Sequence, residues 1–487
     1  MSYHLESKKE GSSCNLNASF EILNKYGTQK KRLRDGNKPI QLKLFETRLN
    51  SETESNSSSS QVLSADSILR MAKEELNQPN SQKAGKFSNL TSRFGFDSRC
   101  DHNHEKLLKL ALCLLKAAEK FSHQDYEAAE KLLSSVLLTS HGDDHPIERV
   151  VTCFARDLRE RIDSEKGKID LEREVVHVDL DEALVDLKAA IHTCEQKLPF
   201  SQIAHFSAVQ TILDSVISAK RVHFIDIGIK LWSHWIVMMH ALANRKKCPL
   251  EQLKITAVCT PKDNIEETGK LLSSFAESMN LPFIFKTLHS EINEVEKDMF
   301  ELEAGEAVIV YLVSTLTCLS ACPKNIEALI KGIKNLNPHL MVVDEVEANI
   351  NGSDFVNRFH EALFLCSAMF DSLGDCLERD DQCRKIIEEV YFQEIIKYGV
   401  MADDDENFMK CCKIDFWREY FARFGIVETE LSQPSMHQAS LLIRDTPCWR
   451  SCTLRMNGKC MLLGWNGTRC VLCLRGSSQN DRISSLF

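Results

Sequence analysis

Three carboxylates stand where an α/β protein could use them for acid–base chemistry. Asp226 lies near the end of the apolar run Val222–Ile227, and Glu345 and Glu347 follow the apolar run Met341–Val343. If both runs are parallel strands, their carboxyl ends meet at the edge of the sheet where such folds bind ligands. One carboxyl group could then serve as a general acid and another as a base. Such carboxylates more often cap helix N-termini, and we favour this structural interpretation.

The turn after Val222–Ile227 could instead approach a cofactor. An S-adenosylmethionine site needs a glycine-rich turn after the first strand, because the backbone must come close to the ligand. The sequence offers Gly228, but bulky Trp232 stands where a second small residue would be needed. We therefore expect the cleft formed by Asp226, Gly228, Trp232 and Glu345 to be narrowed or filled, with no cofactor and no catalytic residues. A methyltransferase-like enzyme or a small-molecule-binding protein is the alternative hypothesis.

Two close cysteine pairs, Cys448 with Cys452 and Cys470 with Cys473, flank a candidate hairpin. Small zinc ribbons are built from such pairs, but Cys452 falls inside a strand-like run, and the histidines show no metal-ligand spacing. We predict no metal site, and zinc is the lesser alternative. The nineteen cysteines are scattered through apolar segments, which favours reduced thiols in a cytosolic or nuclear protein.

The elements that must position these groups alternate between strands and helices. Strand-like runs at 222–227, 253–258, 283–285, 308–313 and 341–344 are separated by amphipathic helical patterns. This alternation predicts an α/β fold with a Rossmann-like, methyltransferase-like, mostly parallel sheet. Near the end, Asn457-Gly458 separates two further strand-like runs. Asn-Gly at such a place predicts a C-terminal antiparallel hairpin with a two-residue type I′ turn.

The rest of the chain divides by composition. The helical pattern over 104–220 predicts an N-terminal helical cap, so that the folded domain covers 101–476 with an α/β core over 221–476. Residues 1–100 are polar and Ser-rich and predict a disordered tail, within which 62–77 could form one amphipathic helix capped by Ser64. A second disordered tail is expected over 477–487.

Charge and hydropathy exclude several classes of protein. The net charge of −10 argues against a broad basic surface for nucleic acid. The first residues lack the apolar core of a signal peptide, and no apolar run approaches the ~18 residues of a membrane span. One basic cluster, formed by Lys30, Lys31, Arg32 and Arg34, is either a solvated charge run or a nuclear import signal. The sequence supports the two readings about equally.

Several motifs, in order, resemble the plant GRAS family of transcriptional regulators. Val222-His223-Phe224-Ile225-Asp226 is similar to the VHIID motif of that family. Leu107–Leu138 and 302–336 are similar to its two leucine-rich segments, 342–351 to a further stretch, and Gly464-Trp465-Asn466-Gly467 to its terminal block. These matches extend over most of the expected folded domain. Two shorter stretches, 266–270 and 421–431, resemble the DELLA-like, gibberellin-repressor-like branch of the family. Residues 1–100, however, contain no acidic-aromatic DELLA motif.

The resemblance implies a nuclear regulator without enzymatic activity. Such a protein would serve as an interaction platform for DNA-binding transcription factors and other GRAS proteins, as a homodimer or heterodimer, in hormone or developmental signalling. Association with DNA could be direct or through these partners. The leucine-rich segments would meet the partners, and the candidate contacts are Leu107, Leu114, Leu329 and Ile333. A leucine stripe is more often part of a core, so the two interpretations stand side by side.

Overall fold

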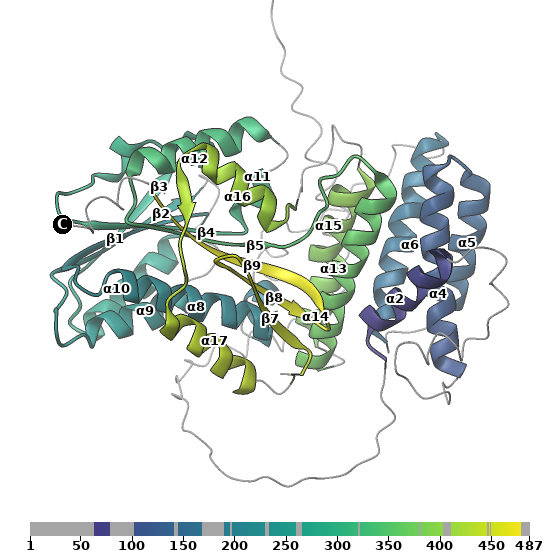
Figure 1. Ribbon diagram of the computed structural model, residues 1–487, viewed down its shortest axis with the longest axis horizontal. Coiled ribbons are helices and arrows are strands. Elements are labelled where there is room, and N and C mark those ends of the chain that lie inside the picture. Colours follow the sequence, from purple (N-terminus) through teal and green to yellow (C-terminus); the bar gives the residue numbers. More distant parts are fainter. Residues whose placement is uncertain are drawn as a thin grey trace, which may run out of the picture.

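The computed structural model shows a mixed α/β fold organised around one sheet (Figure 1). The residues described are 63–77, 102–140, 145–167, 189–194, 197–228, 233–259, 265–319, 322–378, 381–402, 411–445, 448 and 450–478. Within them, nine strands form the sheet in the order β3-β2-β1-β4-β5-β9-β8-β7, and β6 pairs with β9. The strands are β1 (Arg221–Ile227), β2 (Gln252–Cys259), β3 (Phe283–His289), β4 (Ala307–Val313), β5 (Leu340–Val346), β6 (Ile426–Glu428), β7 (Cys452–Asn457), β8 (Cys460–Trp465) and β9 (Thr468–Ser478).

Strand β1 lies in the middle of the parallel half of the sheet. It pairs in parallel with β2 on one side and β4 on the other, so that Phe224 lies opposite Ile255 and Ile309. Phe224 belongs to the core on one face of the sheet, and its neighbour Ile225 belongs to the core on the other. A strand that is covered on both faces needs a nearly continuous apolar run. The predicted α/β fold with a mostly parallel sheet is confirmed.

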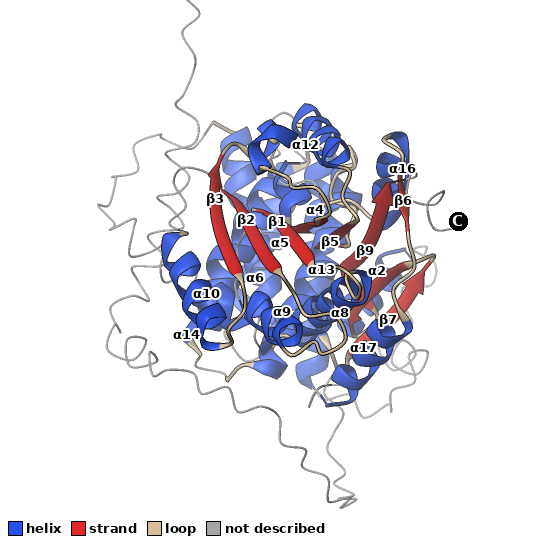
Figure 2. Ribbon diagram, turned by 90° about the vertical axis from the view of Figure 1, so that its left-hand side faces the viewer, coloured by secondary structure: helices blue, strands red, loops and turns tan. Residues whose placement is uncertain are grey.

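Helices cover both faces of the sheet (Figures 1 and 2). One face carries α8 (Pro199–Ser215), α9 (Ser233–Ala243), α10 (Glu266–Ser278) and α17 (Gln433–Asp445). The other carries α11 (Thr315–Leu319), α12 (Pro323–Leu336) and α16 (Ile414–Arg423), and the short 3-10 helices η3 (Ile292–Glu294) and η4 (Lys297–Phe300) precede β4. Because helices cover both faces, the sheet contributes side chains to two large apolar cores, one on each face.

The helical cap is not one continuous segment, which corrects the expectation that it spans 104–220. It contains α2 (Ala65–Asn77), α4 (His102–Ser122), α5 (Tyr126–Thr139) and α6 (Pro146–Glu165), joined by α13 (Phe355–Cys376), α14 (Gln382–Ile386), η5 (Ile387–Tyr391), α15 (Phe392–Ile396) and η6 (Lys397–Met401). In contrast, α8 lies on the sheet beside α17, where Thr211 donates a hydrogen bond to Ser435 over 3.0 Å. An apolar helix face packs wherever a complementary surface exists, and chain order does not decide where that is.

Helix α2 corrects the expected boundary of the folded domain. The helix predicted near 62–77 is present, and the Ser64 hydroxyl accepts a hydrogen bond from the backbone N–H of Ser67, as a helix cap should. Ile68, Leu69 and Met71 are fully buried in the main core, so α2 belongs to the folded domain and not to a disordered tail. The rest of the expected N-terminal tail, including the basic cluster at 30–34, lies outside the described residues.

The C-terminal strands contain an antiparallel hairpin, but its turn differs from the prediction. Asn457 pairs with Cys460, so the loop between β7 and β8 is Gly458-Lys459, and only Gly458 has a positive φ. A type I′ turn needs positive φ at both central residues and is therefore excluded there. The next loop, Asn466-Gly467 between β8 and β9, has φ of 48° and 95° and fits type I′. Strand β9 runs to Ser478, two residues beyond the expected end.

The candidate partner contacts in the leucine-rich segments are core residues. Leu107 and Leu114 lie in α4, Leu329 and Ile333 lie in α12, and all four side chains have no exposed surface. A partner could not touch them while the helices stay packed, so the expectation that they form a contact surface is wrong for the folded chain. The apolar stripe follows the helical period because it faces the interior. None of the described helices is long and apolar enough to cross a membrane.

Candidate functional site

Asp226 is held at the carboxyl end of β1 by the helix that follows. The indole Nε1 of Trp235, in α9, donates a hydrogen bond to Asp226 Oδ2 over 2.9 Å. Asp226 is 3% exposed and Trp235 is fully buried. Burial raises the pKa of Asp226 to about 7, although the hydrogen bond from Trp235 acts in the opposite direction. Among the described residues, the indole of Trp235 is therefore the donor that this buried carboxyl group meets.

The glycine turn after β1 is built as the sequence predicts. Gly228 has a φ of +79°, and its N–H donates to the carbonyl of Val258 over 2.9 Å. Thr315 Oγ1 donates to the carbonyl of Ile227 over 2.9 Å, and a Cβ on Gly228 would lie 3.4 Å from that hydroxyl. Both the left-handed backbone and the close neighbour favour glycine. Trp232 lies outside the described residues, so the expectation that it fills the cleft stays a prediction.

The two glutamates after β5 each satisfy the start of a helix. Glu345 accepts hydrogen bonds from the N–H of Leu316 over 2.6 Å and from the hydroxyl of Thr317 over 2.7 Å, at the beginning of α11. Glu347 accepts from the N–H of Ile414 over 2.8 Å, at the beginning of α16. These contacts match the structural interpretation of the carboxylates, because free N–H groups at helix starts attract negative side chains.

A buried histidine cluster beside Asp226 could not be read from the sequence. The ring of His234 packs against Trp235 and Tyr311, with centroids 4.6 and 5.2 Å away. His205, from α8, lies 5.7 Å from the ring of His234, and its Nε2 is 3.8 Å from Asp344 Oδ2. Burial lowers the pKa of His205 to about 4 and that of His234 well below its usual range. Both imidazoles are neutral at pH 7 and act here as packing groups.

The histidine of the VHIID motif belongs to a second buried network, in the first half of β1. His223 Nε2 lies 2.8 Å from the hydroxyl of Thr256 on β2, and its Nδ1 lies 3.4 Å from Glu306. Lys254 Nζ lies 3.0 Å from Glu306 Oε1 and donates to the carbonyl of Glu301 over 3.0 Å. Burial and the Lys254 ammonium lower the pKa of His223 to about 4. The motif therefore contributes one member of a charge network to the interior of the sheet.

The cysteines provide no metal centre within the described residues, where no group of three or more His, Cys, Asp or Glu side chains is placed to hold an ion. Cys470 and Cys473 are buried in β9, and Cys448 Sγ lies 3.7 Å from the carbonyl of Asp375. None of the cysteines in the described part of the chain forms a disulfide. Burial raises the pKa of Cys470 to about 12, so this thiol is protonated at neutral pH.

Asp226→Asn is expected to make the protein more stable at pH 8 and to have little effect near pH 4. Burial disfavours the ionised form of Asp226, so ionisation of this group destabilises the folded chain. This destabilisation is absent below the ordinary pKa of 3.8 and complete above the folded-state pKa of about 7. The shift between the two pKa values corresponds to roughly 4 kcal/mol as an upper bound. Asparagine keeps an oxygen for the Trp235 donor without the charge. Urea unfolding between pH 5 and pH 8 measures the effect.

The matched control is Asp298→Asn, because Asp298 is exposed on η4. This variant should shift the stability curve equally at every pH. If the gap between Asp226→Asn and the unmodified chain did not widen from pH 5 to pH 8, the buried carboxyl would not carry the charge penalty inferred here.

Comparison with known proteins gives one consistent family. Residues 110–473 match the GRAS domain family. The chain is 28% identical over 370 residues to DELLA protein GAI1 of Vitis vinifera, covering 75% of this chain and 61% of that protein. It is 29% identical over 364 residues to Scarecrow-like protein 23 of Arabidopsis thaliana, covering 74% of this chain and 87% of that protein. The predicted similarity to DELLA proteins is confirmed.

A solved structure supports the fold. The crystal structure of SCL7 in Oryza sativa superposes with a TM-score of 0.66 at 23% identity, covering 75% of this chain and 99% of that one. The sequence match spans the sheet from β1 to the middle of β9, together with the cap helices from the middle of α4 onward. On the strength of a match that covers most of its length, the chain belongs to the GRAS domain family.

Proposed function

We propose that this chain is a nuclear transcriptional regulator of plants that acts as a protein-interaction platform. Its partners would be DNA-binding transcription factors and other GRAS proteins, in hormone or developmental signalling, and dimers with those GRAS proteins would follow. The observation that carries the proposal is the family match over residues 110–473. Relatives named as DELLA and Scarecrow-like proteins support a regulatory role. The match covers 61% of the length of DELLA protein GAI1, so we do not assign the full activity of that relative to this chain.

The chemistry of the sheet edge supports a scaffold more than an enzyme. Asp226 accepts a hydrogen bond from Trp235. Glu345 and Glu347 accept hydrogen bonds from backbone N–H groups at the starts of α11 and α16. A general acid or base must reach a substrate proton, and these carboxyl groups already serve the fold. The alternative of S-adenosylmethionine binding is tested by calorimetric titration of the purified chain. Heat of binding at millimolar ligand would favour that alternative, whereas its absence supports the scaffold.

Partner contacts must use side chains that the fold leaves at the surface. In the first leucine-rich segment, Leu138 at the end of α5 is 77% exposed, in contrast to the buried Leu107 and Leu114 of α4. On α16, Phe416 is 41% exposed and stacks on Tyr420 at 5.7 Å. Scattered apolar residues are normal on protein surfaces, so these side chains limit where contacts can form without defining an interface.

Nuclear import is tested with the basic cluster. Replacing Lys30, Lys31, Arg32 and Arg34 by alanine in the full chain, fused to a fluorescent protein, is expected to move most of the signal from the nucleus to the cytoplasm of plant cells. Import receptors recognise short Lys/Arg runs through their charge, so removing four charges should remove recognition. The ratio of nuclear to cytoplasmic fluorescence is the measurement, and the basic pair Lys8 and Lys9, replaced by alanine, is the control.

The platform role is tested in the same cells. The tagged chain is purified from nuclei after nuclease treatment, so that proteins held only by DNA are lost, and its partners are identified by mass spectrometry. Enrichment of DNA-binding transcription factors is the expected result, and the import variant should lose it. A nuclear signal that survives the four alanine replacements would contradict the import assignment, and nuclei without enriched transcription factors would contradict the platform.

A further inference from the structure

A large groove opens where the N-terminal helix meets the C-terminal strands. Its volume is about 1040 Å³, and it lies between α2, α13 and the strands β7, β8 and β9. Five basic side chains line it, and they come from four different parts of the chain: Arg70 and Lys73 from α2, Lys413 from the segment before α16, Arg455 from β7 and Arg469 from β9. We call this feature the cationic groove. Because its walls are far apart in sequence, no local motif reveals it.

The charge of the cationic groove opposes that of the whole chain. Three carboxylates, Glu74, Glu347 and Glu361, share the lining with the five basic groups. Glu361 pairs with Lys413 at 2.9 Å, and the buried carboxylate of Glu347 pairs with Arg469 at 3.7 Å, so these two acids each offset one basic group. Arg455 is exposed on β7, and the side chain of Arg469 is 48% exposed. The groove is a local excess of positive charge on a chain whose net charge is −10.

The groove also offers apolar surface between its charges. The guanidinium of Arg70 and the ammonium of Lys73 lie 5.4 and 5.6 Å from the centre of the Phe364 ring. Met456, next to Arg455, is 44% exposed. Cation–π contacts of this kind hold the basic groups over the ring, so that less side-chain freedom is lost when an anion binds. A ligand that carries both negative and apolar groups fits this lining.

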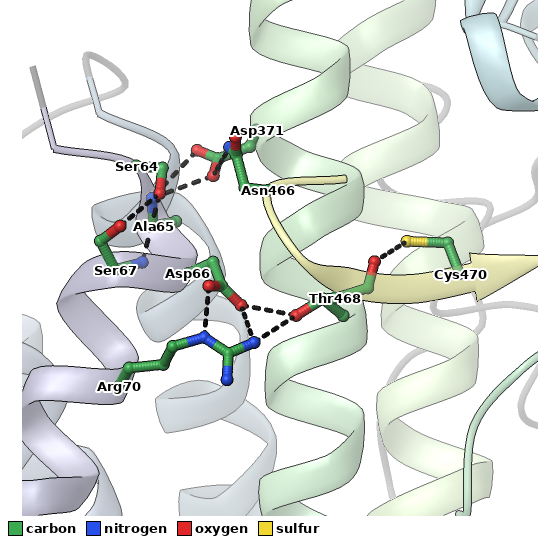
Figure 3. Close-up of polar contacts among 9 residues, drawn as sticks. All are labelled: Ser64, Ala65, Asp66, Ser67, Arg70, Asp371, Asn466, Thr468 and Cys470. Carbon is green, nitrogen blue, oxygen red and sulfur yellow. Dashed lines mark hydrogen bonds and ion pairs between the residues drawn. The ribbon is translucent and has the colours of Figure 1, made fainter. Parts of the chain in front are cut away.

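Helix α2 is fixed firmly enough to form one wall (Figure 3). Asp66 accepts hydrogen bonds from Arg70 over 2.6 Å and from the hydroxyl of Thr468 over 2.5 Å, which ties α2 to the start of β9. The N–H of Ala65 donates to Asp371 of α13 over 2.9 Å. Arg70 thus points from α2 toward the start of β9. Arg70 and Lys73 both precede residues 110–473, which match the GRAS domain family.

We propose that the cationic groove binds an acidic peptide segment of a partner protein, with an apolar residue placed among its carboxylates. Arginine binds carboxylates through two parallel hydrogen bonds. Arg70 already holds Asp66 in this way, so the arginines that would meet the peptide are Arg455 and Arg469. A nucleic acid fits less well, because its phosphates follow one another without interruption and would meet Glu74 and Glu361. A peptide can space its carboxylates to avoid them. The inference rests on the proposed interaction role, for which it names a partner chemistry.

The test uses the purified full chain and needs no nucleus, so its outcome is separate from that of the import and platform experiments. The probes are fluorescent 15-residue peptides that combine Asp and Glu with Leu or Phe, and matched peptides with Asn and Gln in place of the acids. Fluorescence anisotropy is expected to show binding of acidic peptides only, weakening as salt is added. A DNA duplex of equal charge is measured in parallel.

Charge reversal at one lining residue tests whether the peptide binds in the cationic groove. Arg455→Glu should weaken peptide binding by about tenfold or more, because the exposed side chain meets the ligand directly and contributes little to the fold. Arg444→Glu, on an exposed position of α17 outside the groove, makes the same change in net charge and should change affinity by less than about twofold. Equal melting temperatures of the three proteins exclude unfolding as the cause.

Three outcomes overturn the proposal. One is that no acidic peptide of the panel binds at micromolar concentration. The second is that Arg455→Glu and Arg444→Glu weaken binding equally, which would mean a diffuse charge effect. The third is that the duplex binds more tightly than the peptides and depends on Arg455, which would make the groove a nucleic-acid surface.

Discussion

Lys254→Met is expected to lower the free energy of unfolding by about 3–5 kcal/mol, because it leaves a buried carboxylate without its cation. Lys254 is 2% exposed on β2, with its Nζ 3.0 Å from Glu306 Oε1. The side chain of Glu306 is 1% exposed, so water cannot replace the lost partner. Methionine keeps an unbranched apolar stem, and it removes both the charge and the hydrogen bond that Lys254 Nζ donates to the carbonyl of Glu301. Urea unfolding at pH 7.5 measures the difference.

A second substitution separates charge from packing. In Lys254→Met with Glu306→Gln, no buried charge is left, and most of the lost stability should return. Lys220→Met is the control, because Lys220 pairs with Glu251 at 3.0 Å while both side chains are more than half exposed. Exposed pairs contribute about 0–1 kcal/mol. If the double variant were as unstable as Lys254→Met alone, the cause would be packing and the charge argument would fail.

The same substitution reports on the VHIID motif. The ammonium of Lys254 is one of the causes that lower the pKa of His223, after burial. With methionine in its place, burial and the more distant Lys286 ammonium still lower the pKa of His223, but the Lys254 ammonium no longer does, so this pKa should rise. NMR titration of the His223 ring in the folded variant would show it.

Trp235→Ala is expected to have the second large effect, a loss of about 3–5 kcal/mol. The indole is fully buried, and it packs against Phe224 at 5.2 Å and Tyr311 at 5.8 Å between ring centroids. Removing it opens a cavity under β1 and takes away the hydrogen bond that Trp235 donates to Asp226. Thermal and urea unfolding of the purified variant give the magnitude.

Trp235→Phe divides that loss into its two parts. Phenylalanine keeps most of the ring packing and removes the N–H donor, at an expected cost of about 1–3 kcal/mol. The cost should be larger at pH 8 than at pH 5, because the N–H stabilises the carboxylate of Asp226 more than its protonated form. Equal costs at both pH values would show that the hydrogen bond to Asp226 is not what the variant removes.

The sequence alone determined the class of fold and the identity of most of its elements. The run 222–227 was predicted as a buried parallel strand, and it forms β1, one of five parallel strands in the sheet. The cap of α2 at Ser64 and the glycine turn at Gly228 were also predictable. These features are encoded locally: a strand buried on both faces must be apolar throughout, a helix start needs a side-chain acceptor, and a left-handed turn favours glycine.

Only the tertiary structure shows which faces of those elements are buried. The period of Leu107 and Leu114 shows that one face of α4 is apolar, but the same period suits a core and a partner surface. Only the packed bundle shows that both side chains are buried. Likewise, the sequence favoured Trp232 as the residue over the cleft, whereas Trp235 is the tryptophan that bonds to Asp226 in the described structure.

The polar networks are the clearest case of what sequence could not give. His223, Lys254 and Glu306 come from three strands or their flanks, and Arg70 and Arg469 are separated by almost the whole folded chain. Each residue taken singly resembles a surface group. Their roles arise because folding removes water from some of these groups and brings others together at one groove, and both effects depend on the packing of distant segments. Local sequence determines which elements form, and burial in three dimensions determines what their charges do.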